Sequence, residues 1–153
     1  MHVVLYRPEI PPNTGNAMRL CANTGTTLHL IHPLGFSLDE ARLKRAGLDY
    51  RHWADVRNHD SLEDFVTAVA PDRIRAFSQH GRRSYAEVDY GPGDALLFGP
   101  ESDGLPDDVL AWERIDQVLR IPMLPRARSL NLANALAIVV YEAWRQQGFP
   151  GGV

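Results

Sequence analysis

The sequence predicts an α/β protein with a mostly parallel β-sheet flanked by helices. Short β-rich runs alternate along the chain with segments of helical periodicity, a pattern typical of a parallel sheet covered on both faces. The run Ala95–Phe98 is continuously apolar, as expected of a central strand that is buried on both faces. With 153 residues, 44% of them hydrophobic, the chain is expected to form one domain, residues 1–153, with one substantial core.

The elements follow one another in the order that such a sheet requires. The apolar, β-rich runs predict strands at Val3–Tyr6, Leu28–Ile31, Arg73–Ser78, Ala95–Phe98 and Gln117–Ile121, with a weaker one at His52–Val56. Helical spacing of apolar residues predicts helices at Thr14–Asn23, Ser37–Ala46, Leu62–Ala70, Asp107–Trp112 and Leu130–Gln147. The glycine-rich tail Gly148–Val153 is expected to end the last helix.

Composition excludes several classes of protein. No apolar run approaches the ~20 residues that span a bilayer, and the N-terminal segment lacks the pattern of a signal peptide. The single cysteine, Cys21, excludes an intrachain disulfide and is expected to be a small core residue. A chain without disulfides fits a reducing compartment, so we expect a cytoplasmic protein with no membrane partner.

Charge is uneven along the chain. The formal net charge of −3 does not by itself predict a nucleic-acid partner. Basic residues nevertheless cluster at Arg42–Arg45, at Arg82-Arg83, and at Arg126 and Arg128. Such clusters suit phosphate groups, although solvated faces produce similar runs.

The first segment that suggests chemistry is Pro11–Arg19, which links the first strand to the first helix. Asn16 and Arg19 are three residues apart and therefore share one face of the helix. Ligands of open α/β sheets bind beyond the carboxyl ends of the strands, where this segment is expected to lie. Helix capping and turn formation explain the asparagines and the glycine equally well.

The second segment is Phe98–Pro106, a glycine- and proline-rich turn after the predicted central strand. Gly99 is expected to allow a ligand to approach the backbone closely. Glu101 places a carboxylate beside this turn, where an ordinary charged loop residue is the alternative. The segment lacks the lysine and hydroxyl residue of a P-loop, and the chain has no G-x-G-x-x-G fingerprint, so neither kind of nucleotide site is expected.

The third segment covers residues 121–134 and leads from a strand into the last helix. Ser129 lies where the N-cap of that helix is expected. Two prolines brace the preceding loop, and Arg126 and Arg128 add positive charge. A rigid, cationic loop at a helix start suits a polar ligand, whereas the alternative is an ordinary capped helix behind a surface loop.

The last helix is predicted to have two different faces. One is a mixed stripe of residues at helical spacing, formed by Asn134, Ile138, Tyr141 and Arg145. The opposite face is apolar and is formed by Leu132, Leu136, Val139, Val140 and Ala143. The many small residues of this helix would allow another helix to approach closely, for instance across a dimer.

Two other chemistries find no support. The six histidines show no spacing typical of metal ligands, so we expect no metal site. The chain also has no Gly-x-Ser-x-Gly pattern, so the sequence does not predict an α/β-hydrolase.

Taken together, the three segments resemble the motifs of the SPOUT superfamily of RNA methyltransferases. The motifs are Asn13–Arg19, Phe98–Leu105, and Ile121–Met123 with Ser129–Asn134, and they occur in the family's order over nearly the whole chain. Further stretches resemble the branch of tRNA (cytidine/uridine-34)-2'-O-methyltransferases, the TrmL type. These stretches are Leu5–Asn16, Arg45–Tyr50 and Tyr141–Gln146.

The resemblance implies a fold, a cofactor and a substrate. The fold is a single SPOUT domain with a deep C-terminal trefoil knot, assembled as a homodimer. The knot would form a pocket for S-adenosyl-L-methionine near the dimer interface. The reaction would convert this cofactor to S-adenosyl-L-homocysteine and would need no metal. By motif position, the pocket would be lined by Phe77, Gly99, Ile121, Ser129 and Leu130. The implied substrate is the wobble nucleotide, cytidine or a modified uridine at position 34, of leucine tRNAs.

The family pattern assigns the ribose hydroxyl to Arg19. Because the pKa of an arginine exceeds ~12, two roles stay open for this side chain. Arg19 acts as a base once the substrate is bound in a dry site, or it holds a phosphate or the hydroxyl while another group takes the proton. Three residues would support it: Asn13 and Asn16 by positioning it and the partner subunit, and Glu101 by fixing the arginine or the motif loop. Ser129 and Asn131 would hold the cofactor or the ribose.

Contacts to tRNA are expected from basic and aromatic residues, namely Arg42, Lys44, Arg45, Arg126, Arg128 and Tyr141. Binding through such clusters should weaken with salt. Three alternatives stay open: a 2'-O-methyltransferase for another tRNA or ribosomal RNA site, a catalytically silent RNA-binding or assembly protein on the same scaffold, and a generic small-molecule-binding protein. The last of these leaves the three ordered motifs unexplained.

Overall fold

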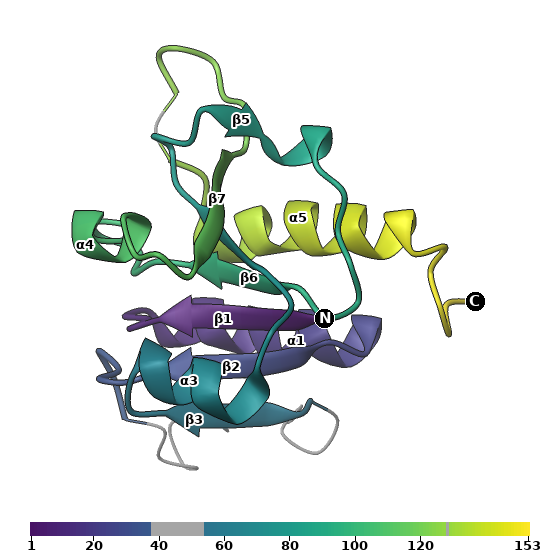
Figure 1. The fold of residues 1–153 in the computed structure, drawn as a ribbon, viewed down its shortest axis with the longest axis horizontal. Helices are drawn as coiled ribbons and strands as arrows, with labels where there is room; N and C mark the ends of the chain where they lie inside the picture. Colours follow the sequence, from purple (N-terminus) through teal and green to yellow (C-terminus); the bar gives the residue numbers. More distant parts are fainter. Residues whose placement is uncertain (38–53, 128) are drawn as a thin grey trace.

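The computed structural model describes residues 1–37, 54–127 and 129–153. The described strands form one seven-stranded parallel sheet with the order β3-β2-β1-β6-β4-β7-β5 (Figure 1). The strands are β1 His2–Tyr6, β2 Thr27–Ile31, β3 Val56–His59, β4 Ile74–Phe77, β5 Arg83–Ser84, β6 Ala95–Phe98 and β7 Ile115–Arg120. The helices are α1 Pro11–Thr24, α3 Leu62–Val69, α4 Asp107–Leu110 and α5 Leu132–Gln146, with a 3-10 helix, η2, at Tyr85–Glu87. The predicted α/β class with a parallel sheet is confirmed.

Helices cover both faces of this sheet. Figure 1 shows α3 in front of the strands and α1 behind them. Alternate residues of the central strands feed the two cores: Val3 and Leu5 pack with α1 and α5, whereas Val4 and Tyr6 pack with α3 and α4. Burial on both faces explains why these strands are almost continuously apolar in sequence. None of the helices in the described ranges is long and apolar enough to cross a membrane.

Helix α1 begins at Pro11, three residues before the predicted start. Prolines suit the first turn of a helix because their missing N–H groups would have no partner inside the helix there. The helix ends where Gly25 adopts a left-handed conformation, with φ 65°. Cys21 is a buried core residue, as predicted, and its burial raises the pKa of the thiol to about 12.

Helix α5 begins two residues later than predicted, and the prediction of Ser129 as its N-cap is wrong. Asn131 is the N-cap, because its Oδ1 accepts hydrogen bonds from the backbone nitrogens of Ala133 at 2.9 Å and Asn134 at 3.4 Å. The predicted division of the helix into two faces is confirmed. Its mixed stripe is exposed, and the apolar face is buried except at the partly exposed Leu132.

Short and irregular elements were predicted least well. The weak strand expected at His52–Val56 begins outside the described residues, and of its described part only Val56 belongs to a strand, since β3 covers Val56–His59. The two-residue β5 and the three-residue η2 were not predicted, because elements this short hold no periodic pattern. The helix expected at Ser37–Ala46 lies outside the described residues except for Ser37.

Candidate active site

A cavity of about 780 Å³ lies at the carboxyl ends of four strands. Its walls come from the segments that follow β1, β4, β6 and β7, and from the start of α5. Because all the strands are parallel, these segments meet at the same edge of the sheet, where ligands of open α/β sheets bind. The structure therefore brings the three predicted motif segments together around one cavity.

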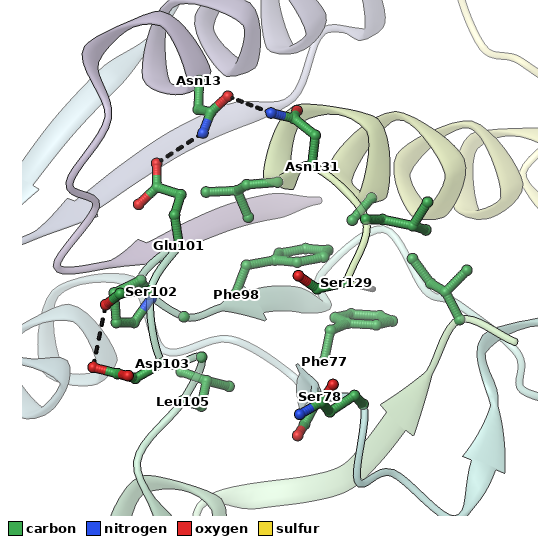
Figure 2. A pocket seen from close by; sticks show the side chains of 18 of the residues that line it. Asn13, Phe77, Ser78, Phe98, Glu101, Ser102, Asp103, Leu105, Ser129 and Asn131 are labelled. Atoms are coloured by element: carbon green, nitrogen blue, oxygen red, sulfur yellow. Dashed lines mark hydrogen bonds between the residues drawn. The ribbon is translucent and has the colours of Figure 1, made fainter. Parts of the chain in front are cut away.

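One wall of the cavity is flat and apolar. Phe77 ends β4 and Phe98 ends β6; the two residues pair in register, and their rings stack at a centroid distance of 4.6 Å with an interplanar angle of 9°. Figure 2 shows Ser129 beside these two rings. A mostly apolar wall with a few polar groups is typical of sites for small organic ligands.

The residues predicted to bind the cofactor lie together in this cavity. The lining of the cavity includes all five residues predicted to bind the cofactor, namely Phe77, Gly99, Ile121, Ser129 and Leu130. Asn131, and not Ser129, caps α5, so the Ser129 hydroxyl does not serve the first turn of this helix. That these residues bind a cofactor stays a prediction, but their meeting at one place is a property of the structure.

The structure gives a further physical reason for glycine at position 99. A Cβ atom at this position would lie 2.3 Å from the carbonyl carbon of Gly104 and 2.3 Å from the backbone nitrogen of Leu105. The chain's own turn therefore requires glycine at this position, and the approach of a ligand to Gly99 stays a prediction. Gly104 requires glycine for a different reason, since its φ is +73°.

A chain of side-chain hydrogen bonds connects the three motifs at the rim of the cavity. The Nδ2 of Asn13 donates to Oε1 of Glu101 at 3.1 Å, and the Nδ2 of Asn131 donates to Oδ1 of Asn13 at 2.9 Å (Figure 2). Asn13 is buried between its two partners. Of the two roles expected for Glu101, this geometry agrees with the fixing of a motif loop.

Two predicted catalytic residues lie apart from the cavity. Asn16 and Arg19 are exposed on α1 and do not belong to the lining of the cavity. Of the residues predicted to contact RNA, Arg126 is exposed in the loop between β7 and α5, and Tyr141 is exposed on α5 with its ring against Trp144. The others, Arg42, Lys44, Arg45 and Arg128, lie outside the described residues.

Several residues of the cavity were not predicted. Ser78, Gln79 and His80 line it directly after β4, and Ile10 and Ser102 line it near the Asn13–Glu101 contact. The rule that ligands bind beyond strand ends would have found the first group, because Ser78 ends a predicted strand and the other two residues follow it. Within the described ranges, no group of three or more His, Cys, Asp or Glu side chains is arranged to hold a metal ion.

Comparison with known proteins identifies the family. The profile of the SpoU rRNA Methylase family matches residues 1–141. The chain belongs to this family. The prediction of an RNA methyltransferase of the SPOUT type is thereby confirmed at the level of the family.

Relatives of this SpoU-family protein align over almost their whole length. A protein of Aeromonas hydrophila is 56% identical over 153 residues, which cover 100% of this chain and 98% of the relative. A protein of Escherichia coli is 52% identical over 153 residues, with the same coverage. Both are named tRNA (cytidine(34)-2'-O)-methyltransferase.

Solved structures agree with the fold of this SpoU-family protein. A putative RNA methyltransferase from Bacillus anthracis superposes with a TM-score of 0.91 at 49% identity, covering 99% of this chain and 96% of that one. A structure concerned with the 2-OH methylation of C/U34 on tRNA gives 0.87 at 51% identity, covering 96% and 95%. The SpoU methyltransferase AviRb from Streptomyces viridochromogenes, in complex with the cofactor AdoMet, gives 0.82 at 26% identity, covering 96% and 60%. The predicted SPOUT-type α/β architecture is therefore confirmed.

Proposed function

We propose that this protein transfers a methyl group from S-adenosylmethionine to the ribose 2'-hydroxyl of the wobble nucleotide, position 34, of leucine tRNAs. The observation that carries the proposal is the meeting of the three motif segments around one cavity. The names of relatives that are 52% and 56% identical over the whole chain support the reaction and the nucleotide. The choice of leucine tRNAs rests on the resemblance to the TrmL-type branch.

The residues of the cavity fit the proposed cofactor. Its volume of about 780 Å³ lies in the usual range for small-molecule sites, roughly 300–1,000 Å³. The stacked rings of Phe77 and Phe98 offer an apolar wall to a purine ring, and the carboxylates of Glu101 and Asp103 on the lining suit a cationic ligand. Ser129 and Asn131 offer a hydroxyl and an amide to a ribose. S-adenosylmethionine, when bound, supplies a methyl group that is already activated by its sulfonium.

The protein must then align the ribose hydroxyl and assist the loss of its proton. Arg19 stays our candidate for this step, in either of two roles: base in a dry site, or holder of a phosphate or the hydroxyl. Its exposed position outside the cavity lining supports a site completed by a second copy of the chain. In such a homodimer, Asn16 and Arg19 of one protomer would approach the RNA bound at the other protomer's cavity.

The exposed faces of two neighbouring helices support the homodimer. Helix α1 packs against α5, and both present polar or mixed stripes outward. Ile138 and Tyr141 on α5 are 36% and 46% exposed, so the mixed stripe offers apolar surface that a second copy could cover. The same proposal includes three further properties: a single domain, a C-terminal trefoil knot and a cytoplasmic location. Contacts of Arg126 and Tyr141 with tRNA also belong to it.

A direct test is transfer of labelled methyl groups to unmodified leucine tRNA transcripts, followed by mass spectrometry of the nucleosides. We expect label at the 2'-oxygen of nucleotide 34 and no transfer to a transcript with a 2'-deoxynucleotide there. Arg19→Ala should lower the rate by at least about a hundredfold, the usual worth of a group that assists proton transfer. The matched control Arg114→Ala, an exposed arginine just before β7, should leave the rate unchanged.

The outcomes of this test separate the alternatives. Label at another nucleotide, or on ribosomal RNA alone, would contradict the assignment to position 34 and favour a related 2'-O-methyltransferase. Full activity of a folded Arg19→Ala protein would exclude Arg19 from catalysis. A protein that binds RNA but neither transfers methyl groups nor binds S-adenosylhomocysteine would favour the alternative of a catalytically silent RNA-binding protein.

A further inference from the structure

Two carboxylates cross between the segment before α1 and the loop after β6. Glu101 of the loop accepts hydrogen bonds from two backbone nitrogens of the segment, from Glu9 at 2.8 Å and from Ile10 at 3.2 Å. Glu9 of the segment accepts from Ser102 of the loop in return. Its Oε2 accepts from the Ser102 backbone nitrogen at 3.0 Å, and its Oε1 accepts from the Ser102 hydroxyl at 3.0 Å. Each carboxylate therefore holds the backbone of the other's segment.

The backbone around Glu9 is fixed by tertiary contacts from its other side. Gly35 passes so close that a Cβ atom there would lie 2.9 Å from the Cα of Glu9, and its backbone nitrogen donates to the Pro8 carbonyl at 2.9 Å. Arg7 has a φ of 50°, a left-handed conformation that costs free energy in a non-glycine residue. Such a conformation persists where the surrounding structure determines it, and it often marks functional segments. Glu9 thus projects from a rigid base.

The crossed contacts connect two parts of the proposed active site. The loop from Pro100 to Gly104 forms one wall of the cavity and is closed by a hydrogen bond from the Gly104 nitrogen to the Pro100 carbonyl at 3.0 Å. Helix α1 has no side-chain cap of its own and no acidic residue in its first turn, so Glu101 satisfies the donors just before it. Glu9 serves the loop in the same way. The cavity wall and the helix that carries Asn13, Asn16 and Arg19 are consequently held as one unit.

We propose that Glu9 is a positioning residue of this site, resting on the proposed function. Its carboxylate holds Ser102, and through Ser102 it keeps the wall of residues 100–104 in the position that binds the cofactor. Glu9 does not belong to the lining of the cavity, so it acts through Ser102 rather than by touching the cofactor. A purely structural role would lower stability alone, whereas positioning changes affinity for the cofactor in protein that is still folded.

The test compares Glu9→Gln with the wild type. The amide oxygen can still accept from the Ser102 backbone nitrogen, and the amide NH2 can donate to the Ser102 hydroxyl, which also lies 3.2 Å from Oδ2 of Asp103. Glu9→Gln therefore removes the negative charge from both contacts and weakens them. At a temperature where circular dichroism shows folded protein, we expect the Kd for S-adenosylhomocysteine and the KM for S-adenosylmethionine to rise about tenfold, the size expected when a hydrogen bond to a charged group becomes a neutral one. The KM for tRNA should stay unchanged and kcat should change less than the cofactor KM. The control Glu113→Gln, at an exposed glutamate before β7, should behave as the wild type.

The Ser102 side provides a second, independent measurement. Ser102→Ala should raise the same Kd, and Ser102→Thr, which keeps the hydroxyl, should restore affinity close to that of the wild type. In the double variant of Glu9→Gln and Ser102→Ala the two effects should combine to less than their product, because both changes act on the same contact.

Each other outcome overturns the inference. Glu9→Gln protein with a lower melting temperature but wild-type cofactor affinity would show a structural role only. Effects of the two substitutions that multiply fully would show that Glu9 and Ser102 act separately. If Glu9→Gln does not fold, Glu9→Asp, which keeps the carboxylate but shortens its reach to Ser102, takes its place in the same measurements. Wild-type protein that binds no S-adenosylhomocysteine would overturn the proposed function together with this inference. Failure of the proposed function is therefore distinguishable from failure of the role of Glu9 alone.

Discussion

Three histidines from neighbouring strands form a hydrogen-bonded row on one face of the sheet. His29 on β2 is fully buried and contacts His2 on β1 at 3.1 Å and His59 on β3 at 2.9 Å through its two ring nitrogens. The ring of Phe65 packs edge-on against His29. The histidines are 27 and 30 residues apart, so no spacing in the sequence indicated that they would meet. Burial, followed by the neighbouring histidines, lowers the pKa of His29 to about 3.

This row predicts that stability falls in mild acid. The pKa of His29 in the folded protein lies below the ~6.5 of an unfolded chain, so the unfolded state binds the extra proton as the pH falls from about 6.5 toward 3. The free energy of unfolding should fall by about 2 kcal/mol from this group between pH 6.5 and pH 5, as measured by urea unfolding. His29→Gln should unfold more easily at both pH values but show a smaller difference between them.

A matched control for the acid effect is His80→Gln, at an exposed histidine on the rim of the cavity. It should keep the wild-type dependence of unfolding on pH. An unchanged pH dependence in His29→Gln would show that other groups, such as the carboxylates, cause the acid destabilisation.

At the scale of elements, sequence patterns predicted the existence of helices and strands better than their ends. Helical spacing found α5 and its two faces, but it placed the cap at Ser129 because a serine before an apolar run is the usual signal. Asn131 is an equally good cap, and it also bonds Asn13, a residue 118 positions away. A contact of that range leaves no mark on local periodicity, so the start of the helix was not predictable from its own sequence.

The two contacts of Asn131 predict different effects for two substitutions. Asn131→Ala removes both the cap and the donor to Asn13, and it should lower the free energy of unfolding by about 1 kcal/mol or more and weaken binding of S-adenosylhomocysteine. Asn131→Asp keeps a capping oxygen but loses the donor, so stability should be retained better than cofactor affinity. Urea unfolding and calorimetry measure the two quantities separately.

Ser61→Ala is the control for the loss of a cap alone. The Ser61 hydroxyl oxygen accepts from the Asp64 nitrogen at 3.0 Å and caps α3, which packs on the face of the sheet opposite α1 and α5. This variant should lose similar stability and keep its cofactor affinity. Equal loss of cofactor affinity in Ser61→Ala and Asn131→Ala would show that affinity follows general stability, against the specific role of Asn131.

For the whole molecule, the parallel sheet determines where the site forms. Because the strands run the same way, motif segments that each follow a strand had to meet at one edge, and the cavity at Phe77, Gly99 and Ser129 was predictable from that rule and the family resemblance. The order of strands was not predictable, since β6 lies between β1 and β4 through long-range pairing that no local pattern encodes. The contact of Glu9 with Ser102, 93 residues away, is hidden from the sequence for the same reason.

The same edge of the sheet should carry the electrostatic attraction for tRNA. The chain has a formal net charge of −3, so affinity for a polyanion must come from local arginines rather than from the whole protein. Arg126 is exposed in the loop that runs from β7 past the cavity to α5. If its guanidinium meets a phosphate, the affinity for tRNA should fall steeply with salt, and Arg126→Ala should reduce the slope of log K against log salt by about 1. Filter binding at several salt concentrations measures this slope, with Arg114→Ala at the amino end of β7 as the control. Equal slopes for Arg126→Ala and the wild type would place the tRNA backbone elsewhere on the protein.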